Sequence, residues 1–228
     1  MNGCDFSGKT VFLTGGARGI GHDIKVLLEE LGATVIAPTR SELDLSIPEQ
    51  IEDYIHRNQT LEVDIFIHCA GMNQLASLHE LDQNVFHKTF QVNYFSAVRL
   101  SQYFAEHMRK RAFGRIIFIS SIYALVSRER RLQYTSSKTA ITGLVKTLAI
   151  EEGINNILVN AVAPGYVMTE MTLQNLSQEE IQDLTEMIPT RKLQTVRDIS
   201  NLVAFLASDF NQSITGQLIA VDGGFTCR

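Results

Sequence analysis

The stretch "TVFLTGGARGIGHDIKVLLEELG", residues 10–32, decides the fold of this chain. A short β-rich run over 10–16 ends in glycines, and an amphipathic helix pattern follows it and stops at Gly32. The helix pattern rests on these apolar residues at helical spacing: Ile20, Ile24, Leu27, Leu28 and Leu31. A strand, a glycine-rich turn and a helix in this order predict the first unit of an α/β domain.

The rest of the chain continues this alternation. Strand patterns cover residues 33–37, 63–71, 114–121, 157–165 and 217–224, and helix patterns cover about 83–111, 133–152 and 195–208. Several strands are continuous apolar runs, which is typical of parallel strands buried on both faces. The pattern predicts an α/β fold with a doubly wound parallel sheet between two helical layers, a Rossmann-type three-layer sandwich. Residues 1–228 show no linker or repeat, which indicates a single domain.

One connection in this pattern is unusually short. Only a few residues separate "VIA" (35–37) from "LDLS" (43–46), whereas a crossover between parallel strands usually needs roughly a dozen or more. We therefore expect no helix between these segments and a short third strand over 43–46 at an edge of the sheet.

The composition excludes several classes of protein. Hydrophobic residues make up 45% and charged residues 20% of 228 residues, and the net charge of -5 argues against a nucleic-acid-binding face. No apolar run is long enough to span a membrane, and the first ten residues contain no signal-peptide pattern. Cys4, Cys69 and Cys227 have no metal-binding spacing. We expect no metal site, reduced thiols and a cytoplasmic location.

The turn "TGGARGIG" (14–21) is suited to a nucleotide phosphate, because glycines permit close backbone approach and the next helix directs its N–H groups at an anion. NAD sites usually place a carboxylate at the end of the second strand, and an arginine there accommodates a 2′-phosphate. Here Arg40 follows that strand, Glu42 comes late and Arg18 lies in the turn. The sequence favours NADPH/NADP+, with NADH/NAD+ as the alternative.

The stretch "QYTSSKTA" (133–140) places Tyr134 four residues before Lys138. In a helix these side chains lie on one face. A free phenol has a pKa of about 10, and a neighbouring ammonium favours its deprotonated form. The pair is thus a candidate for proton transfer at neutral pH, although a pair this short also occurs by chance on surface helices.

Together with further motifs in the same order, these residues resemble the short-chain dehydrogenase/reductase family over almost the whole chain. Tyr134 and Lys138 match YxxxK. The other matches are Thr14, Gly15, Gly19 and Gly21 in the TGxxxGxG turn; Asp44-Leu45; "HCAG" (68–71) where NNAG is usual; Asn93 in "QVNYF"; Ser121 in "ISS"; "APG" (163–165) followed by Thr169; and "VDGG" (221–224).

The resemblance implies a role for each catalytic residue. Tyr134 would be the general acid in carbonyl reduction and the base in the reverse direction. Lys138 would hold the nicotinamide ribose and lower the tyrosine pKa, Ser121 would hydrogen-bond the substrate oxygen, and Asn93 would order a water that passes protons to Lys138. The implied cofactor contacts are Gly15, Arg18, Gly19, Ile20, Gly21, Arg40, Asp44, Leu45, Ala70, Gly71, Tyr134, Lys138, Pro164, Gly165, Val167 and Thr169.

Three residues depart from the pattern or compete with it. His68 and Cys69 replace the usual two asparagines. A histidine at a strand end is a candidate base, but it is more often a structural group, and Cys69 is expected to be a small buried residue rather than a reactive thiol. Ser120 is an alternative to Ser121, although the distance to Tyr134 favours Ser121.

Two stretches are candidates for choosing the substrate. The loop "SRERRLQ" (127–133) contains Arg128, Arg130 and Arg131, which either attract an anionic group such as a phosphate, a carboxylate or an acyl-carrier protein, or form a solvated surface. The segment 168–193 matches a flap over the substrate in the family. Its apolar residues form either a lid or one face of a helix: Met168, Met171, Leu173, Leu176, Ile181, Leu184, Met187 and Ile188.

The resemblance implies an NAD(P)(H)-dependent oxidoreductase that interconverts a ketone and a secondary alcohol, with a small-molecule carbonyl or alcohol as substrate. Within the family the chain is most similar to 3-oxoacyl-[acyl-carrier-protein] reductases, and a sugar-ketone reductase is the main competitor. Nucleotide-sugar epimerases and dehydratases have an added C-terminal domain that we do not expect here. A non-catalytic nucleotide-binding regulator would have lost Ser121, Tyr134 or Lys138. A homo-oligomer, a dimer or tetramer paired through helices 83–111 and 133–152, is also implied.

Overall fold

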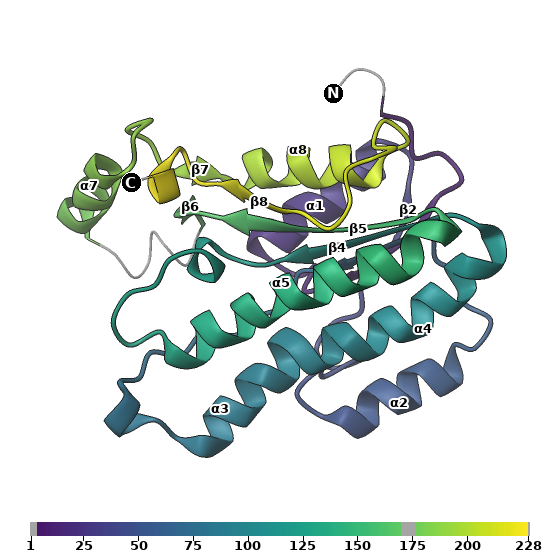
Figure 1. The fold of residues 1–228 in the computed structure, drawn as a ribbon, viewed down its shortest axis with the longest axis horizontal. Helices are drawn as coiled ribbons and strands as arrows, with labels where there is room; N and C mark the ends of the chain where they lie inside the picture. The colour runs from purple at the N-terminus through teal and green to yellow at the C-terminus, as the bar shows by residue number, and fades with distance from the viewer. Residues whose placement is uncertain (1–3, 170–176, 228) are drawn as a thin grey trace.

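The computed structural model describes residues 4–169 and 177–227. Within them, six parallel strands form one sheet in the order β2-β1-β3-β4-β5-β8 (Figure 1). The strands are β1 (Thr10–Thr14), β2 (Thr34–Ile36), β3 (Ile65–His68), β4 (Gly114–Ile119), β5 (Ile157–Pro164) and β8 (Leu218–Val221). Val11 of β1 pairs with Val35 on one side and with Ile65 on the other, which fixes the register at the centre of the sheet. The predicted doubly wound parallel sheet is confirmed.

Helices cover both faces of the sheet and complete the three layers (Figure 1). One layer contains α2 (Pro48–Arg57), α4 (Ser96–Arg111) and α5 (Leu132–Glu152), and the other contains α1 (Gly19–Glu30) and α8 (Val196–Ala207). Each layer encloses its own apolar cluster. Because successive strand residues point to opposite faces, Phe12 belongs to the first cluster and Leu13 to the second. The Phe12 ring packs 4.7 Å from the ring of Phe104.

The predicted third strand over 43–46 is wrong. In the structure these residues form turns and irregular backbone, and β2 is the edge strand. The Asp44 carboxylate accepts hydrogen bonds from the backbone N–H and the hydroxyl of Ser46, so the local side chain satisfies backbone groups that a strand would pair. The expectation of a missing crossover helix is also wrong, because α2 (Pro48–Arg57) connects β2 to the next strand, β3.

The predicted helix over 83–111 is divided into three parts. Helix α3 (Gln83–Phe90) leads into a π-helical segment, η2 (Gln91–Phe95), and α4 continues from Ser96. A π segment inserts an extra residue into a turn and is frequent at functional sites. Asn93 lies in this segment and is fully buried.

Smaller elements gather at the carboxyl ends of the strands, on the left in Figure 1. They include β6 (Val167–Met168), β7 (Gln194–Thr195) and α7 (Gln178–Met187), with the short 3-10 turns η1 (Leu78–Glu80), η3 (Ile122–Ala124) and η5 (Phe225–Cys227); a further 3-10 turn, η4 (Gly153–Asn155), follows α5. Helix α7 contains no buried residue, whereas Ile188 directly after it is buried. Of the proposed lid residues, Met171, Leu173 and Leu176 lie outside the described residues.

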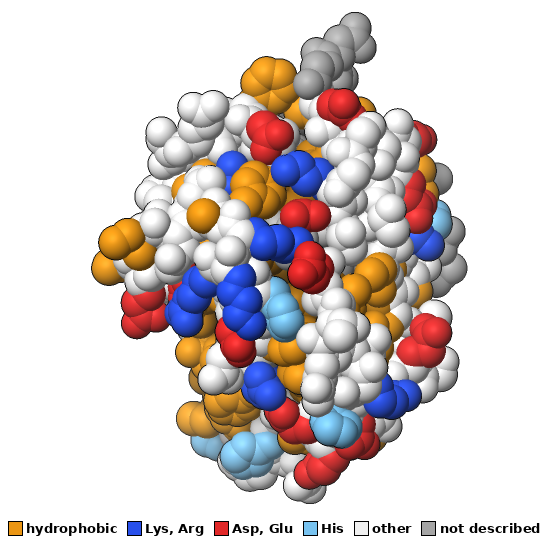
Figure 2. Space-filling view, turned by 90° about the vertical axis from the view of Figure 1, so that its right-hand side faces the viewer, with side chains coloured by type: hydrophobic (Ala, Val, Ile, Leu, Met, Phe, Trp, Pro, Cys, Tyr) orange, Lys and Arg blue, Asp and Glu red, His pale blue; other side chains and the backbone are white. Residues whose placement is uncertain are grey.

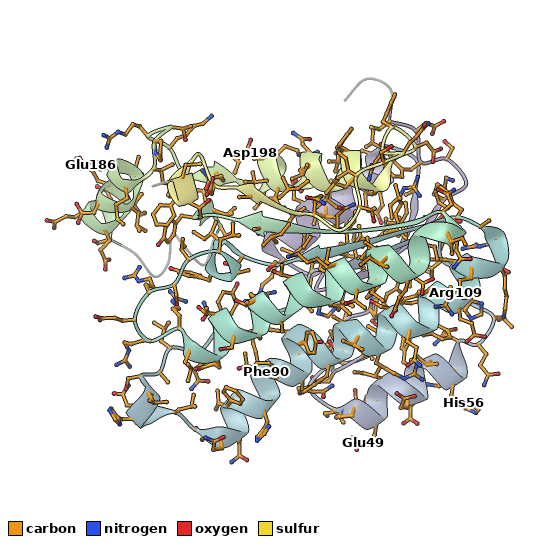
Figure 3. All side chains as sticks on the ribbon, viewed as in Figure 1. Glu49, His56, Phe90, Arg109, Glu186 and Asp198 are labelled. Carbon is orange, nitrogen blue, oxygen red and sulfur yellow. The ribbon has the colours of Figure 1, made fainter. Side chains whose placement is uncertain are left out.

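The opposite end of the molecule has a surface of mixed charge (Figure 2). Basic and acidic side chains alternate there, and ion pairs such as Arg111 with Asp64 and Lys9 with Asp209 join neighbouring elements. Arg109, labelled in Figure 3, pairs with the buried carboxylate of Glu152 and joins α4 to α5. Among the described residues, no helix has the length and hydropathy needed to cross a membrane.

Candidate active site

A cleft of about 1070 Å³ lies at the carboxyl ends of the central strands. The chain leaves β1 toward β2 and returns to β3 on the other side of β1, and ligands of doubly wound folds bind at such a switch point. All of the predicted cofactor contacts line this cleft, and so does Ser121. Among residues 4–169 and 177–227 no group of side chains is suited to a metal ion.

The floor of the cleft is the glycine turn between β1 and α1. Gly15 has a positive φ of 74°, and a Cβ there would lie 2.7 Å from the backbone nitrogen of Ala70. A Cβ on Gly21 would lie 2.1 Å from the carbonyl oxygen of Gly15, so the turn closes tightly only with glycine at both positions. Helix α1 begins without a side-chain cap and without an acidic residue in its first turn. Its N–H groups are therefore suited to the pyrophosphate of a dinucleotide.

The wall beside β2 contains the arginine that the sequence singled out. The Arg40 side chain is 75% exposed, and its Nε lies 3.0 Å from the carboxylate of Asp44. Glu42, the late acid, accepts hydrogen bonds from the backbone and hydroxyl of Thr39 and so faces its own turn. Arg40 thus reaches the predicted wall, but it is paired with Asp44, which the sequence did not predict.

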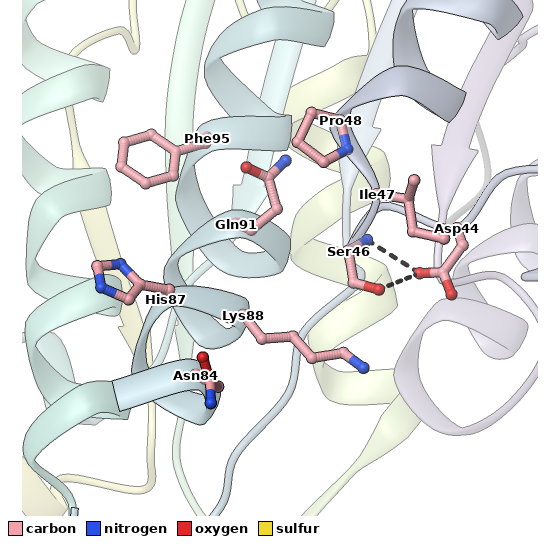
Figure 4. Close-up of a pocket in the computed structure, with 9 residues that line it drawn as sticks. All are labelled: Asp44, Ser46, Ile47, Pro48, Asn84, His87, Lys88, Gln91 and Phe95. Atoms are coloured by element: carbon pink, nitrogen blue, oxygen red, sulfur yellow. Dashed lines mark hydrogen bonds between the residues drawn. The ribbon is translucent and has the colours of Figure 1, made fainter. Parts of the chain in front are cut away.

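A second pocket of about 590 Å³ adjoins this wall between the 44–48 loop and α3 (Figure 4). Lys88 extends from α3 toward Asp44 and Ser46 and lines both the pocket and the cleft. Lys88 could not be identified from the sequence, because a single lysine on an amphipathic helix matches no motif. This pocket does not include the tyrosine and lysine pair, so the larger cleft is the candidate active site.

Helix α5 presents Tyr134 and Lys138 on one face, as predicted. The Lys138 ammonium lies 5.8 Å from the centre of the Tyr134 ring and donates a hydrogen bond of 2.7 Å to the carbonyl of Ile119 at the end of β4. The Ser121 hydroxyl hydrogen-bonds to Tyr134. Ser120 instead donates to the carbonyl of Lys138 at 3.1 Å. The geometry therefore favours Ser121 over Ser120 as the partner of Tyr134.

Asn93 lies behind the cleft rather than in its lining. Its side-chain amide donates to the carbonyl of Met72 and to the hydroxyl of Ser137, and its oxygen accepts from the Met72 N–H at 2.8 Å. A Cβ added at Gly71 would lie 3.5 Å from the Asn93 oxygen and 3.4 Å from the Lys138 nitrogen. The π segment thus brings Asn93 next to Lys138, and the pair encloses the backbone that follows β3.

Burial shifts the pKa values of both Tyr134 and Lys138 in the direction that favours their neutral forms. Burial raises the pKa of Tyr134, while the hydrogen bond from Ser121 and the charge of Arg131 oppose that rise. The pKa of Tyr134 is thus raised overall and Lys138 is not among the causes of the shift, so the lowering of the tyrosine pKa by Lys138 stays a prediction. Burial also lowers the pKa of Lys138 to about 8. At neutral pH the site therefore contains a neutral phenol, which is a proton donor, beside an ammonium ion.

His68 is a structural group, as its position at a strand end suggested. Its Nδ1 lies 3.1 Å from the Thr14 hydroxyl and its Nε2 lies 3.1 Å from the carbonyl of Val92. Burial lowers the pKa of His68 to about 3, so the ring is neutral at pH 7. Burial likewise raises the pKa of the Cys69 thiol to about 12, which excludes a reactive thiolate at neutral pH.

Two tyrosines that the sequence did not single out form a contact chain next to Tyr134. Tyr123 lies in η3, two residues after Ser121, and its ring packs edge-on against Tyr134 with 6.2 Å between centroids. The hydroxyl of Tyr166 lies 3.2 Å from that of Tyr123. Neither tyrosine belongs to a motif. The sequence signal that could have identified them is their proximity along the chain to Ser121 and to Gly165.

Comparisons with known proteins agree with this geometry. A family model described as enoyl-(acyl carrier protein) reductase matches residues 4–226. The 3-oxoacyl-[acyl-carrier-protein] reductase FabG of Escherichia coli K12 is 32% identical over 96% of this chain and 98% of its own length.

Solved structures show the same similarity. A putative NAD(P)-dependent gluconate 5-dehydrogenase from Beutenbergia cavernae with bound NADP has a TM-score of 0.92 and 29% identity, covering 98% of this chain and 99% of its own. A 7α-hydroxysteroid dehydrogenase in complex with NADH and 7-oxo glycochenodeoxycholic acid has a TM-score of 0.88 and 26% identity, covering 96% and 95%.

The fold, the phosphate-binding turn and these relatives together define an NAD(P)-dependent oxidoreductase. The chain belongs to the short-chain dehydrogenase/reductase family.

Proposed function

We propose that this protein reduces a ketone to a secondary alcohol with NADPH and that Tyr134 donates the proton. The observation that supports this most directly is the contact between the Ser121 hydroxyl and the half-buried Tyr134 phenol, with the Lys138 ammonium on the same side of α5. A neutral phenol and a hydroxyl converge there on one point of the cleft. A carbonyl oxygen placed at that point receives two hydrogen bonds as negative charge develops on it.

The nicotinamide supplies the hydride, and the protein positions and polarises the reactants. Tyr134 transfers its proton to the substrate oxygen, and Ser121 stabilises the charge on that oxygen. Lys138 uses one of its three donors on Ile119 and keeps the others for the nicotinamide ribose. Asn93 holds the backbone at Met72 and orients the Ser137 hydroxyl beside Lys138.

We test the mechanism by initial rates at the nicotinamide absorbance band. NADPH and NADH are offered with 3-oxoacyl thioesters, keto sugars and simple diketones, and Tyr134→Phe is the control. One class of ketone is expected to oxidise NADPH in a tyrosine-dependent manner, with a loss of about 100- to 10,000-fold in the variant. Cofactor binding without turnover of any ketone would favour the non-catalytic regulator.

Preference for NADPH is proposed from the charges beside β2. The guanidinium of Arg40 and the cation of Arg18 both line the nucleotide end of the cleft, where a 2′-phosphate would lie. We expect Arg40→Ala to weaken NADPH binding about 10- to 150-fold and to leave NADH binding unchanged, since a charge-assisted contact contributes about 1.5–3 kcal/mol. Equal affinities for the two cofactors in the variant, with no loss for NADPH, would contradict this preference.

The relatives leave open which ketone is the substrate. The FabG relative acts on 3-oxoacyl groups and the Beutenbergia structure is described as a gluconate dehydrogenase, so both classes belong in the panel. The proposed setting is the cytoplasm, where the three free cysteines stay reduced. A homo-oligomer is proposed because Ile150 of α5 and Ile154 are 83% and 92% exposed.

A further inference from the structure

The loop between η3 and α5, which connects Ser121 to Tyr134, contains three arginines, and they have different partners. Arg130 has a positive φ of 64°, and its guanidinium lies 2.9 Å from the carboxylate of Glu80. Its carbonyl accepts a hydrogen bond of 3.2 Å from the N–H of Ala76, and Ala76 also forms a bridge with Arg131. Arg130 therefore fixes the loop to the 76–80 segment and has its charge neutralised.

Arg131 extends over the aromatic rings next to the reacting centre. Its guanidinium carbon lies 5.2 Å from the centre of the Tyr123 ring, and that ring packs against Tyr134. The charge of Arg131 also acts on Tyr134 itself, where it opposes the rise in pKa that burial causes. Arg131 thus places a positive charge close to the proton donor.

Arg128 contacts the same tyrosine, but through its hydroxyl. It hydrogen-bonds to the hydroxyls of Tyr123 and Tyr166, which lie 3.2 Å from each other. Burial raises the pKa of Tyr123 to about 12, so this phenol is neutral and does not balance the charge of the guanidinium. Tyr123 is only 7% exposed, whereas Arg128 itself is exposed and therefore open to a ligand.

Two guanidinium groups therefore lie next to Tyr123, whose ring packs against Tyr134. Among residues 4–169 and 177–227, neither Arg128 nor Arg131 forms an ion pair with a carboxylate, in contrast to Arg130. Guanidinium groups bind planar carboxylates and phosphates with paired hydrogen bonds. In a chain of net charge -5, this placement of unpaired positive charge around Tyr123 indicates a ligand of the opposite sign.

We propose that the substrate is a ketone with an anionic group, and that Arg128 and Arg131 bind this group while its carbonyl lies between Ser121 and Tyr134. This inference rests on the proposed function, because it assumes that the carbonyl is reduced at Tyr134. The same chemistry fits a carboxylate or a phosphate, so the test contains both.

The test compares each anionic ketone with a neutral one of the same skeleton. 5-Ketogluconate is paired with L-sorbose, which has an alcohol in place of the carboxylate, and fructose 6-phosphate is paired with fructose. The ratio of kcat/KM within each pair is measured with NADPH for the wild type and for the double variant Arg128→Gln/Arg131→Gln. Arg57→Gln, which removes an exposed arginine of α2, is the control. Loss of Arg131 also changes the surroundings of Tyr134, and this change affects both ketones of a pair equally. It therefore cancels in the ratio of their kcat/KM values.

We expect the wild type and Arg57→Gln to prefer one of the anionic ketones at least about tenfold, and the double variant to lose this preference. The pair in which the preference occurs distinguishes a carboxylate from a phosphate. Tyr134-dependent turnover of the neutral ketones at equal or higher kcat/KM, unchanged in the double variant, would overturn the inference and leave the proposed function intact. Turnover that is independent of Tyr134 would overturn the proposed function instead.

A binding measurement applies if none of the four ketones is turned over. The NADP+-saturated protein is titrated calorimetrically with 5-ketogluconate and with inorganic phosphate. Saturable binding of either anion to the wild type and to Arg57→Gln, lost in the double variant, supports the anionic subsite. Absence of saturable binding of both anions to the wild type would overturn it.

Discussion

Two polar networks lie next to each other at the carboxyl ends of the central strands. They differ in whether their side chains keep hydrogen-bonding groups available for a ligand. In the first, the two ring nitrogens of His68 are both occupied, by Thr14 and by the carbonyl of Val92. In the second, Lys138 has donors to spare after its bond to Ile119, and Tyr134 contacts Ser121 at the cleft surface. The first network is closed and the second is open to a ligand.

The comparison shows that burial of a polar side chain does not by itself indicate catalysis. His68 and Lys138 are both almost fully buried. Burial lowers the pKa of each side chain and so favours its neutral form. The difference lies in the remaining hydrogen-bonding capacity, because a satisfied group stabilises the fold and an unsatisfied donor facing a cleft is available to a ligand.

Removal of the Lys138 ammonium should reduce catalysis more than replacement of His68 does. In Lys138→Met we expect at least about a 100-fold loss of kcat/KM together with weaker NADP+ binding, because the donors to the ribose are absent. Stability should stay the same or rise, since a buried charge is replaced by an apolar chain of similar length. Steady-state kinetics and a thermal melt measure both, and a destabilised variant with normal cofactor affinity would contradict an open network.

The pKa of Lys138 adds a pH dependence to this prediction. The folded-state pKa of about 8 lies below the ordinary value of 10.5. As the pH rises above about 8, the wild type loses the ammonium and should bind NADP+ more weakly, whereas Lys138→Met should show no such decline. Between pH 8 and 10.5 Lys138 is neutral in the folded protein and protonated in the unfolded chain. The contribution of Lys138 to the free energy of unfolding of the wild type therefore increases as the pH rises through this range.

Replacement of the histidine should have the smaller effect on catalysis and a clear effect on stability. The folded-state pKa of about 3 lies below the ordinary value of 6.5, so stability that depends on neutral His68 is present above pH 6.5 and is lost as the pH falls toward 3. The slope is about 1.4 kcal/mol per pH unit. His68→Asn should cost about 1–3 kcal/mol at pH 7.

Urea unfolding at a series of pH values checks this expectation. The difference in unfolding free energy between the wild type and His68→Asn should narrow as the pH falls below 6.5, because only the wild type loses stability through the histidine. A difference that does not change between pH 7 and pH 4 would mean that His68 is not held neutral by the closed network.

Much of this site could be predicted from the sequence, since motifs at fixed distances along an alternating α/β chain determine which residues meet at the strand ends. The glycine turn, Tyr134, Lys138 and Ser121 were all predicted to lie together, and they line one cleft. The choice of Ser121 over Ser120 followed from spacing, and the hydrogen bonds agree with it.

The remaining features depend on hydrogen bonds, backbone geometry and burial that the motifs do not reveal. The strand expected at 43–46 is replaced by a turn because Asp44 satisfies the backbone of Ser46. The π segment around Asn93 has the same apolar pattern as an ordinary helix. The pKa of Tyr134 depends on how deeply its ring is buried, and spacing to Lys138 contains no information about burial.

The most direct test of the two networks is a comparison of kcat for Tyr134→Phe and His68→Asn at pH 7, with the same ketone and saturating NADPH. Tyr134→Phe should lower kcat at least about 100-fold without a change in melting temperature, because a single hydroxyl of the open network supplies the proton. His68→Asn should keep kcat within about threefold while its melting temperature falls by several degrees. A loss of kcat in His68→Asn as large as that in Tyr134→Phe would contradict the separation of a closed structural network from an open catalytic one.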